Sequence, residues 1–180
     1  MVEAPMISEF ASDPAVEAAE RALDETRVIA GGQYHRTLKD LGLEPDVLCW
    51  VYEAERNELQ LAIVTSMAER IEGLSIYKLL FRAYEAAATP REIDPFIVSI
   101  YGPKSDFGAT LRRHLGAMAQ RGAFSTPQRA ALFAMTNAGA PGRLVVLGKG
   151  VYAASEGHRS AAEDLKRFQR FQRRVRALAA

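Results

Sequence analysis

The sequence contains a single cysteine and a single tryptophan among its 180 residues. One cysteine excludes a disulfide within the chain and a zinc site built from several cysteines. No apolar run approaches the ~18 residues of a membrane-spanning helix. The first ten residues, MVEAPMISEF, are acidic and lack the apolar segment of a signal peptide. We therefore expect a cytoplasmic protein without a transmembrane segment.

No catalytic, metal-binding or cofactor-binding motif is recognisable. The histidines (His35, His114 and His158) are scattered, and none has a second histidine or a carboxylate at the i+3 or i+4 spacing of helical metal ligands. Cys49 lies within an expected strand, where a small core residue is a simpler interpretation than a nucleophile. We predict no catalytic residue, cofactor or metal. An enzyme acting in a cleft of residues 47–101 stays an open alternative.

The net charge of +1 conceals an uneven distribution of charge along the chain. Residues 1–102 contain 9 Lys and Arg against 18 Asp and Glu, a balance of −9, whereas residues 103–180 contain 14 against 4, a balance of +10. Such asymmetry predicts either an anionic partner for the basic half or docking of one half on the other. We expect an acidic α+β domain over 1–102 and a basic, mostly helical half over 103–180, with one continuous domain as the alternative.

A strand–turn–strand–helix–strand pattern over residues 47–101 organises the chain. Apolar residues occupy both faces of the strands VLCWVYE (47–53) and ELQLAIV (58–64), which predicts a sheet covered on more than one side. The polar residues between them suit a hairpin turn. A helical pattern then leads to a third strand over 96–100, parallel to the second. The sequence thus predicts an α+β fold with a small sheet flanked by helices.

Helices are expected on both sides of this unit. Asp13–Pro14 is a strong helix start, and the apolar stripe that follows predicts a helix ending at Gly31–Gly32. A short second helix is expected over 34–41. At the other end of the chain, Ser155 or Ser160 begins a long helix that continues to the C-terminus.

The segment 105–154 predicts a helix over 105–121, a turn, a second helix over 126–139, and a glycine-turned hairpin in GRLVVLGKGVYAAS. That order resembles the second half of a winged-helix module, in which the second helix enters the major groove and the hairpin is the wing. The resemblance implies that Lys149 at the wing tip and Arg143 at its base meet phosphates. The second helix is a nearly continuous apolar run, so we expect phosphate contacts without residues that read bases.

The C-terminal helix is the second candidate site. Its arginines recur near one face at a spacing that suits successive phosphates. An apolar stripe runs along the same helix and is formed by Leu165, Phe168, Phe171 or Gln172, Val175 and Leu178. A basic amphipathic helix of this kind binds nucleic acid, an anionic membrane surface or an acidic protein partner, or it packs on its own domain.

Our leading hypothesis is a non-enzymatic regulator whose basic half contacts the phosphates of DNA or RNA. The alternative is a protein–protein interaction or self-association module, in which the arginine-rich amphipathic helix docks on an acidic partner or on a second copy of the chain. The cations expected to contact nucleic acid are Arg112, Arg113, Arg129, Arg143, Lys149, Lys166, Arg167, Arg170, Arg173 and Arg174.

Overall fold

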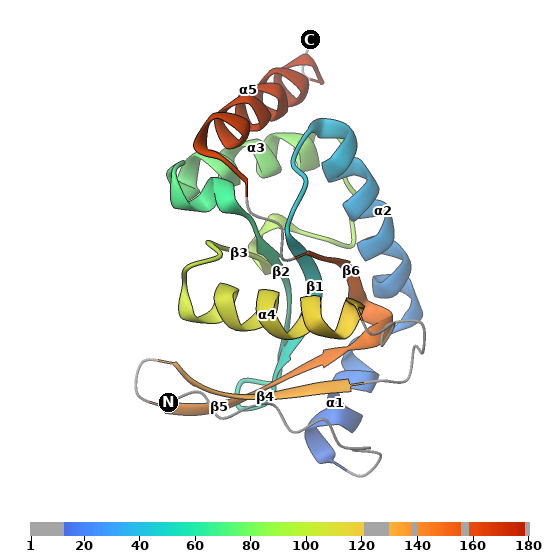
Figure 1. Ribbon diagram of the computed structural model, residues 1–180. Helices are drawn as coiled ribbons and strands as arrows, with labels where there is room; N and C mark the ends of the chain where they lie inside the picture. The colour runs from blue at the N-terminus through green and yellow to red at the C-terminus, as the bar shows by residue number, and fades with distance from the viewer. Residues whose placement is uncertain (1–12, 121–129, 138–139, 156–158, 179–180) are drawn as a thin grey trace.

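The computed structural model describes residues 13–120, 130–137, 140–155 and 159–178, and it has an α+β fold (Figure 1). A mixed sheet has the strand order β3–β2–β1–β5–β4, and β6 also pairs with β1. The strands are β1 (Val47–Glu53), β2 (Glu58–Val64), β3 (Val98–Tyr101), β4 (Ala130–Asn137), β5 (Ala140–Leu147) and β6 (Val151–Ala154). The helices are α1 (Pro14–Ala22), α2 (Glu25–Leu41), α3 (Gly73–Glu85), α4 (Asp106–Gln120) and α5 (Ala161–Ala177).

The hairpin–helix–strand unit expected over 47–101 is confirmed. β1 and β2 pair antiparallel from Val47 opposite Val64 to Glu53 opposite Glu58. The turn between them contains Asn57 at a positive φ of 54°, a conformation that asparagine tolerates better than most residues. α3 then crosses over to β3, which pairs with β2 in parallel.

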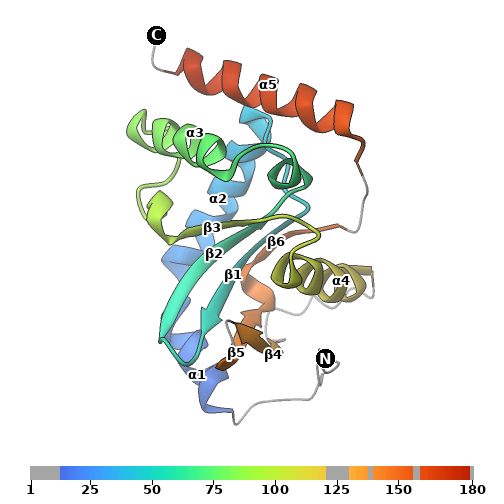
Figure 2. The ribbon, with the colours of Figure 1, turned by 90° about the vertical axis from the view of Figure 1, so that its left-hand side faces the viewer.

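Both faces of the sheet are covered, as the apolar character of both strand faces predicts. On one face of β1, Leu48 and Trp50 belong to a core to which α1, α2, α3 and α5 contribute. On the other, Val47 and Cys49 pack with apolar residues of α4. Figure 2 shows α4 on one side of the sheet and α2 on the other. Cys49 is fully buried, as expected of a core residue, and burial raises the pKa of its thiol.

The helix expected over 126–139 is wrong in its described part. Ala130–Asn137 is β4, which pairs with β5 without interruption along its length. The wing is also wrong: β5 and β6, on either side of the short 3-10 turn Gly148–Gly150, both pair with β1 and not with each other. β5 and β6 both pair with the side of β1 that faces away from β2. The described residues therefore contain no helix–turn–helix followed by a wing.

The expected helix end at Gly31–Gly32 is wrong as well. α1 stops at Ala22, the Asp24 side chain caps α2, and α2 runs through both glycines to Leu41. Gly31 serves packing instead. Tyr152 of β6 lies against α2 at this point, and its hydroxyl donates a 2.8 Å hydrogen bond to the carbonyl oxygen of Val28.

We expect Gly31→Ala to lower the free energy of unfolding by about 1–3 kcal/mol. A Cβ at Gly31 would lie 2.3 Å from the hydroxyl oxygen of Tyr152, so the ring would have to move and lose its hydrogen bond to Val28. Gly32→Ala is the matched control, because its Cβ would meet no atom closer than 3.8 Å. The control should gain up to about 1 kcal/mol from helix propensity. Urea denaturation measures both, and equal stabilities would contradict the prediction.

Strands and core residues on both sides of residue 102 are packed together. β1 lies in the acidic half of the chain, whereas its partners β5 and β6 lie in the basic half. Phe171 and Val175 of α5 belong to the same core as residues of α2 and α3. Among the described helices, none is both long and apolar enough to cross a bilayer.

Candidate nucleic-acid interface on the C-terminal helix

Helix α5 begins at a capping box. The hydroxyl oxygen of Ser160 accepts a hydrogen bond from the Glu163 backbone N–H, and the Glu163 carboxylate accepts one from the Ser160 N–H at 2.8 Å. This reciprocal arrangement satisfies two backbone donors that a helix start leaves open. Of the two expected starts, Ser155 and Ser160, the structure uses Ser160.

One face of α5 is packed within the chain. The helix lies across α2 and α3 (Figure 2), and Phe171 and Val175 are buried between them. The ends of the apolar stripe remain in solvent, with Leu165 50% and Leu178 41% exposed. The centre of the stripe is therefore used inside the chain and is not available to a partner.

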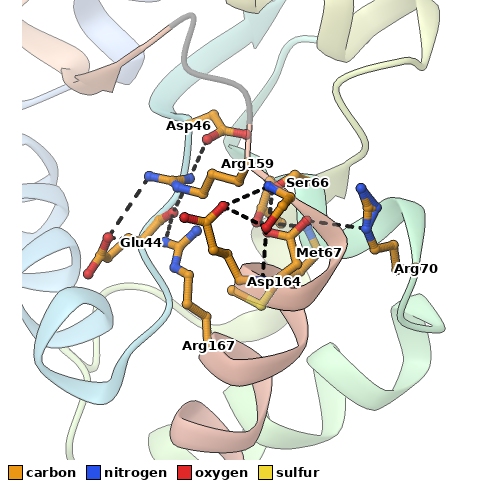
Figure 3. A network of polar contacts seen from close by, with 11 residues as sticks. Glu44, Asp46, Ser66, Met67, Arg70, Arg159, Asp164 and Arg167 are labelled. Carbon is orange, nitrogen blue, oxygen red and sulfur yellow. Dashed lines mark hydrogen bonds and ion pairs between the residues drawn. The ribbon is translucent and has the colours of Figure 1, made fainter.

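A buried carboxylate fixes the first turn of this helix (Figure 3). Asp164 is 0% exposed, and its Oδ1 accepts a 2.7 Å hydrogen bond from the hydroxyl of Ser66. Its Oδ2 lies 3.5 Å from Nε of Arg70, whose side chain is 38% exposed. A carboxylate without water needs such partners, because desolvation of an isolated charge is very costly. Asp164 therefore ties α5 to the segment that follows β2.

Two arginines make a second connection, to the segment that precedes β1. Arg159 Nη1 lies 2.5 Å from Asp46 Oδ1, and Arg167 Nη2 donates to the backbone oxygen of Glu44 at 2.5 Å (Figure 3). The Glu44 carboxylate lies 3.3 Å from the same Arg167 atom. Burial raises the pKa of the Asp46 carboxyl, and the charge of Arg159 acts in the opposite direction.

These contacts belong to a wider pattern in which cations of the basic half pair with carboxylates of the acidic half. Arg143 of β5 lies 3.7 Å from both Asp13 and Glu55, and Lys149 lies 2.6 Å from Glu20. Arg159 and Arg167 pair as described above. Part of the charge asymmetry thus serves the docking of one half on the other. Arg143, Lys149 and Arg167 of the predicted site are engaged in this way.

Five further cations of the basic half lie on the outer face of α5. We call these five residues the basic face: Lys166, Arg170, Arg173, Arg174 and Arg176. All five are exposed, and no carboxylate of the described residues pairs with them. At 3.6 residues per turn they occupy an arc of roughly 160°, and at 1.5 Å per residue they extend over about 15 Å.

Neighbouring groups hold the basic face in position. The aliphatic part of Arg170 lies over Gly42, the glycine at φ 99° that ends α2. Arg174 donates a hydrogen bond to the backbone oxygen of Asp40. Glu163, the exposed acid of the first turn, folds back on Ser160, and these hydrogen bonds lower the pKa of its carboxyl. The face thus presents several cations on a fixed helix.

The other predicted cations lie elsewhere. Arg112 and Arg113 are on α4, which covers the opposite side of the sheet from α2; Arg113 is exposed, whereas Arg112 is half-buried and has a partner. Burial lowers the pKa of His114 beside them, and Arg113 adds to that effect. Arg129 lies outside the described residues. The structure therefore brings together Lys166, Arg170, Arg173 and Arg174 of the predicted set, and adds Arg176.

Sequence reasoning missed the residues that anchor α5. Asp164 stands four, seven and eleven positions before Phe168, Phe171 and Val175, so it occupies the apolar stripe of the helix. A charged residue on such a stripe is a signal for a buried ion pair. Its partners Ser66 and Arg70 lie about a hundred residues earlier, and the sequence offers no indication of them.

Comparison with protein-family models finds no match, and searches of curated proteins and of solved structures find none either. The described residues contain no group of three or more His, Cys, Asp and Glu side chains placed to hold a metal ion.

Proposed function

We propose that the protein binds nucleic acid through phosphate contacts from the basic face of α5. The supporting observation is the division of the cations: those of the basic half that pair with carboxylates tie the chain together, whereas the five on the outer face of α5 have no carboxylate partner among the described residues. One strand of a duplex carries a phosphate every ~3.4 Å along the axis, so a face about 15 Å long spans about four. The contacts are to the backbone and carry no base specificity.

The test is a salt series of binding to a labelled DNA duplex and to an RNA of equal length, with the full chain. Deletion of α5 is unsuitable, because Phe171 and Val175 belong to the core. The variant Lys166→Gln/Arg170→Gln/Arg173→Gln removes three cations of the basic face. The control, Arg21→Gln/Arg56→Gln/Lys104→Gln, removes the same charge from exposed positions outside α5.

We expect the slope of log K against log salt to become shallower by about 3 in the α5 variant, since each lost phosphate contact releases about one counterion fewer. The control should keep the wild-type slope. An equal loss in both variants would mean that overall charge, and not the basic face, drives binding. If the wild-type protein binds neither nucleic acid at low salt, the proposal fails, and an acidic protein partner becomes the better explanation of the exposed cations.

A further inference from the structure

Among the strands that the structure describes, β3 and β4 form the two edges of the sheet. An edge strand has backbone N–H and C=O groups that no neighbouring strand pairs with, and such groups form a template for another strand. Proteins commonly block an edge with side chains or cover it with another segment. The two edges of this sheet differ in this respect.

The β3 edge is closed by its own chain. The Tyr77 hydroxyl of α3 donates a 2.9 Å hydrogen bond to the carbonyl oxygen of Val98 and accepts one from the Ile100 N–H at 3.2 Å. The Val98 N–H is bonded to the carbonyl oxygen of Pro95, in the short helical turn before the strand. One phenol and one turn thus take up three of the four outward backbone groups of Val98 and Ile100, which leaves an incoming strand little to pair with.

The outward groups of β4 follow from its pairing. The Ala54 N–H donates to the carbonyl oxygen of Arg143 at 3.0 Å, so the backbone of Arg143 faces β1. The backbone N–H and C=O groups of successive residues point to alternate sides of a strand. Those of Leu144 therefore point toward β4, where Phe133 is the paired residue. The same alternation turns the backbone groups of Leu132, Ala134 and Thr136 away from β5. No described strand pairs with that side of β4.

The sequence of β4 contains nothing that would oppose strand pairing. AALFAMTN has eight residues without a charge or a proline, whereas natural edges are commonly protected by lysine, proline or a bulge. Because the strand is uncharged, two copies can lie side by side without repulsion. An antiparallel pair about a two-fold axis is also self-complementary.

We propose that a second copy of this chain pairs with the β4 edge, antiparallel and about a two-fold axis. The register that opposes all three outward residues is centred on Ala134, with Leu132 opposite Thr136 of the second copy. The sheet then runs from the β3 edge of one copy to the β3 edge of the other. Because Tyr77 and Pro95 close both ends, the assembly stops at a dimer.

The dimer leaves the basic face accessible. Both ribbon views place α5 and the β4–β5 hairpin at opposite ends of the molecule (Figures 1 and 2). A pair joined through β4 therefore carries one basic face at each far end.

The test is sedimentation of the full chain from roughly 1 to 100 µM, a range in which mass action reveals a dimer. We expect the wild type to reach twice the mass of the chain. Ala134→Pro removes an outward N–H, a change that an edge strand tolerates, and it should give a monomer with the wild-type circular dichroism. Ala131→Pro is the matched control, because it removes an inward N–H and should destabilise the hairpin. A wild-type monomer at the highest concentration, or a dimer in the folded Ala134→Pro variant, overturns the proposal.

A cross-linking experiment tests the register without a proline. Ala134→Cys places a thiol at the proposed two-fold axis, and the native Cys49 is buried and shielded. A short bifunctional thiol reagent should convert most of this variant to a covalent dimer, and Lys104→Cys, on an exposed position away from β4, should stay monomeric. Equal cross-linking of both variants, or none of the Ala134→Cys variant, contradicts the β4 pairing.

Discussion

Replacing Asp164 with alanine is expected to lower the free energy of unfolding by about 3 kcal/mol, the scale of loss when one member of a buried ion pair is removed. The side chain is fully buried, accepts a hydrogen bond from Ser66 and pairs with Arg70. Alanine would leave the hydroxyl of Ser66 without this partner and open a gap under the first turn of α5. Urea denaturation should show a lower midpoint with an unchanged m-value.

The comparison variant for Asp164→Ala is Arg167→Met, which removes a buried cation and keeps an unbranched stem of similar size. It should cost about 1 kcal/mol or less, because its partner Glu44 is 44% exposed and can be solvated by water. Arg159 still donates to the backbone oxygen of Glu44 and pairs with Asp46. A larger loss in Arg167→Met than in Asp164→Ala would show that the arginine, and not the carboxylate, anchors α5.

Gly108→Ala is expected to cost more than about 2 kcal/mol, near the upper end of overpacking losses. A Cβ at this position would lie 2.1 Å from the carbonyl oxygen of Gly102 and 2.8 Å from the hydroxyl of Ser105. Ser105 caps α4 and donates to that same carbonyl. The blocking atom belongs to the backbone, so relief requires the start of α4 to move, whereas at Gly31 one side chain can turn aside.

Gly73→Ala is the control for Gly108→Ala, because Gly73 opens a helix and a Cβ there would meet no atom within 4 Å. It should leave stability unchanged or raise it by up to about 1 kcal/mol. For a chain of this length, each kcal/mol corresponds to roughly 2–4 °C in Tm. Thermal unfolding should therefore place Gly108→Ala below the wild type and Gly73→Ala at or above it, and equal Tm values of the two variants would contradict the clash.

Local sequence patterns predicted strands β1 and β2 correctly. The structure of residues 130–137 and the role of Gly31 depend on contacts with distant parts of the chain. The alternation in 47–53 and 58–64 indicates strands because both faces repeat every second residue. The run 130–137 has no such period: its alanines favour a helix, and only the pairing with β5 makes it a strand. From the sequence alone, Gly31 indicates the end of a helix. The structure shows that it instead makes room for the ring of Tyr152, which lies over a hundred residues later in the chain.

The candidate site shows the same division between local and distant information. The spacing of Lys166, Arg170 and Arg173 places them on one helix face from sequence alone. The sequence cannot show which cations are already paired, because Arg143 and Lys149 find their carboxylates in distant parts of the chain.

The position of β1 in the sheet has a consequence for synthesis of the chain. β1 leaves the ribosome long before β5 and β6, which pair with its second side. At translation rates of about 5–20 residues per second, the hundred or so residues between them take roughly 5–20 s. Throughout that interval β1 lacks the strands that pair with its second side, and unpaired strand edges of this kind are sites for chaperones and for misassembly. Folding can be completed only after α5 has been released.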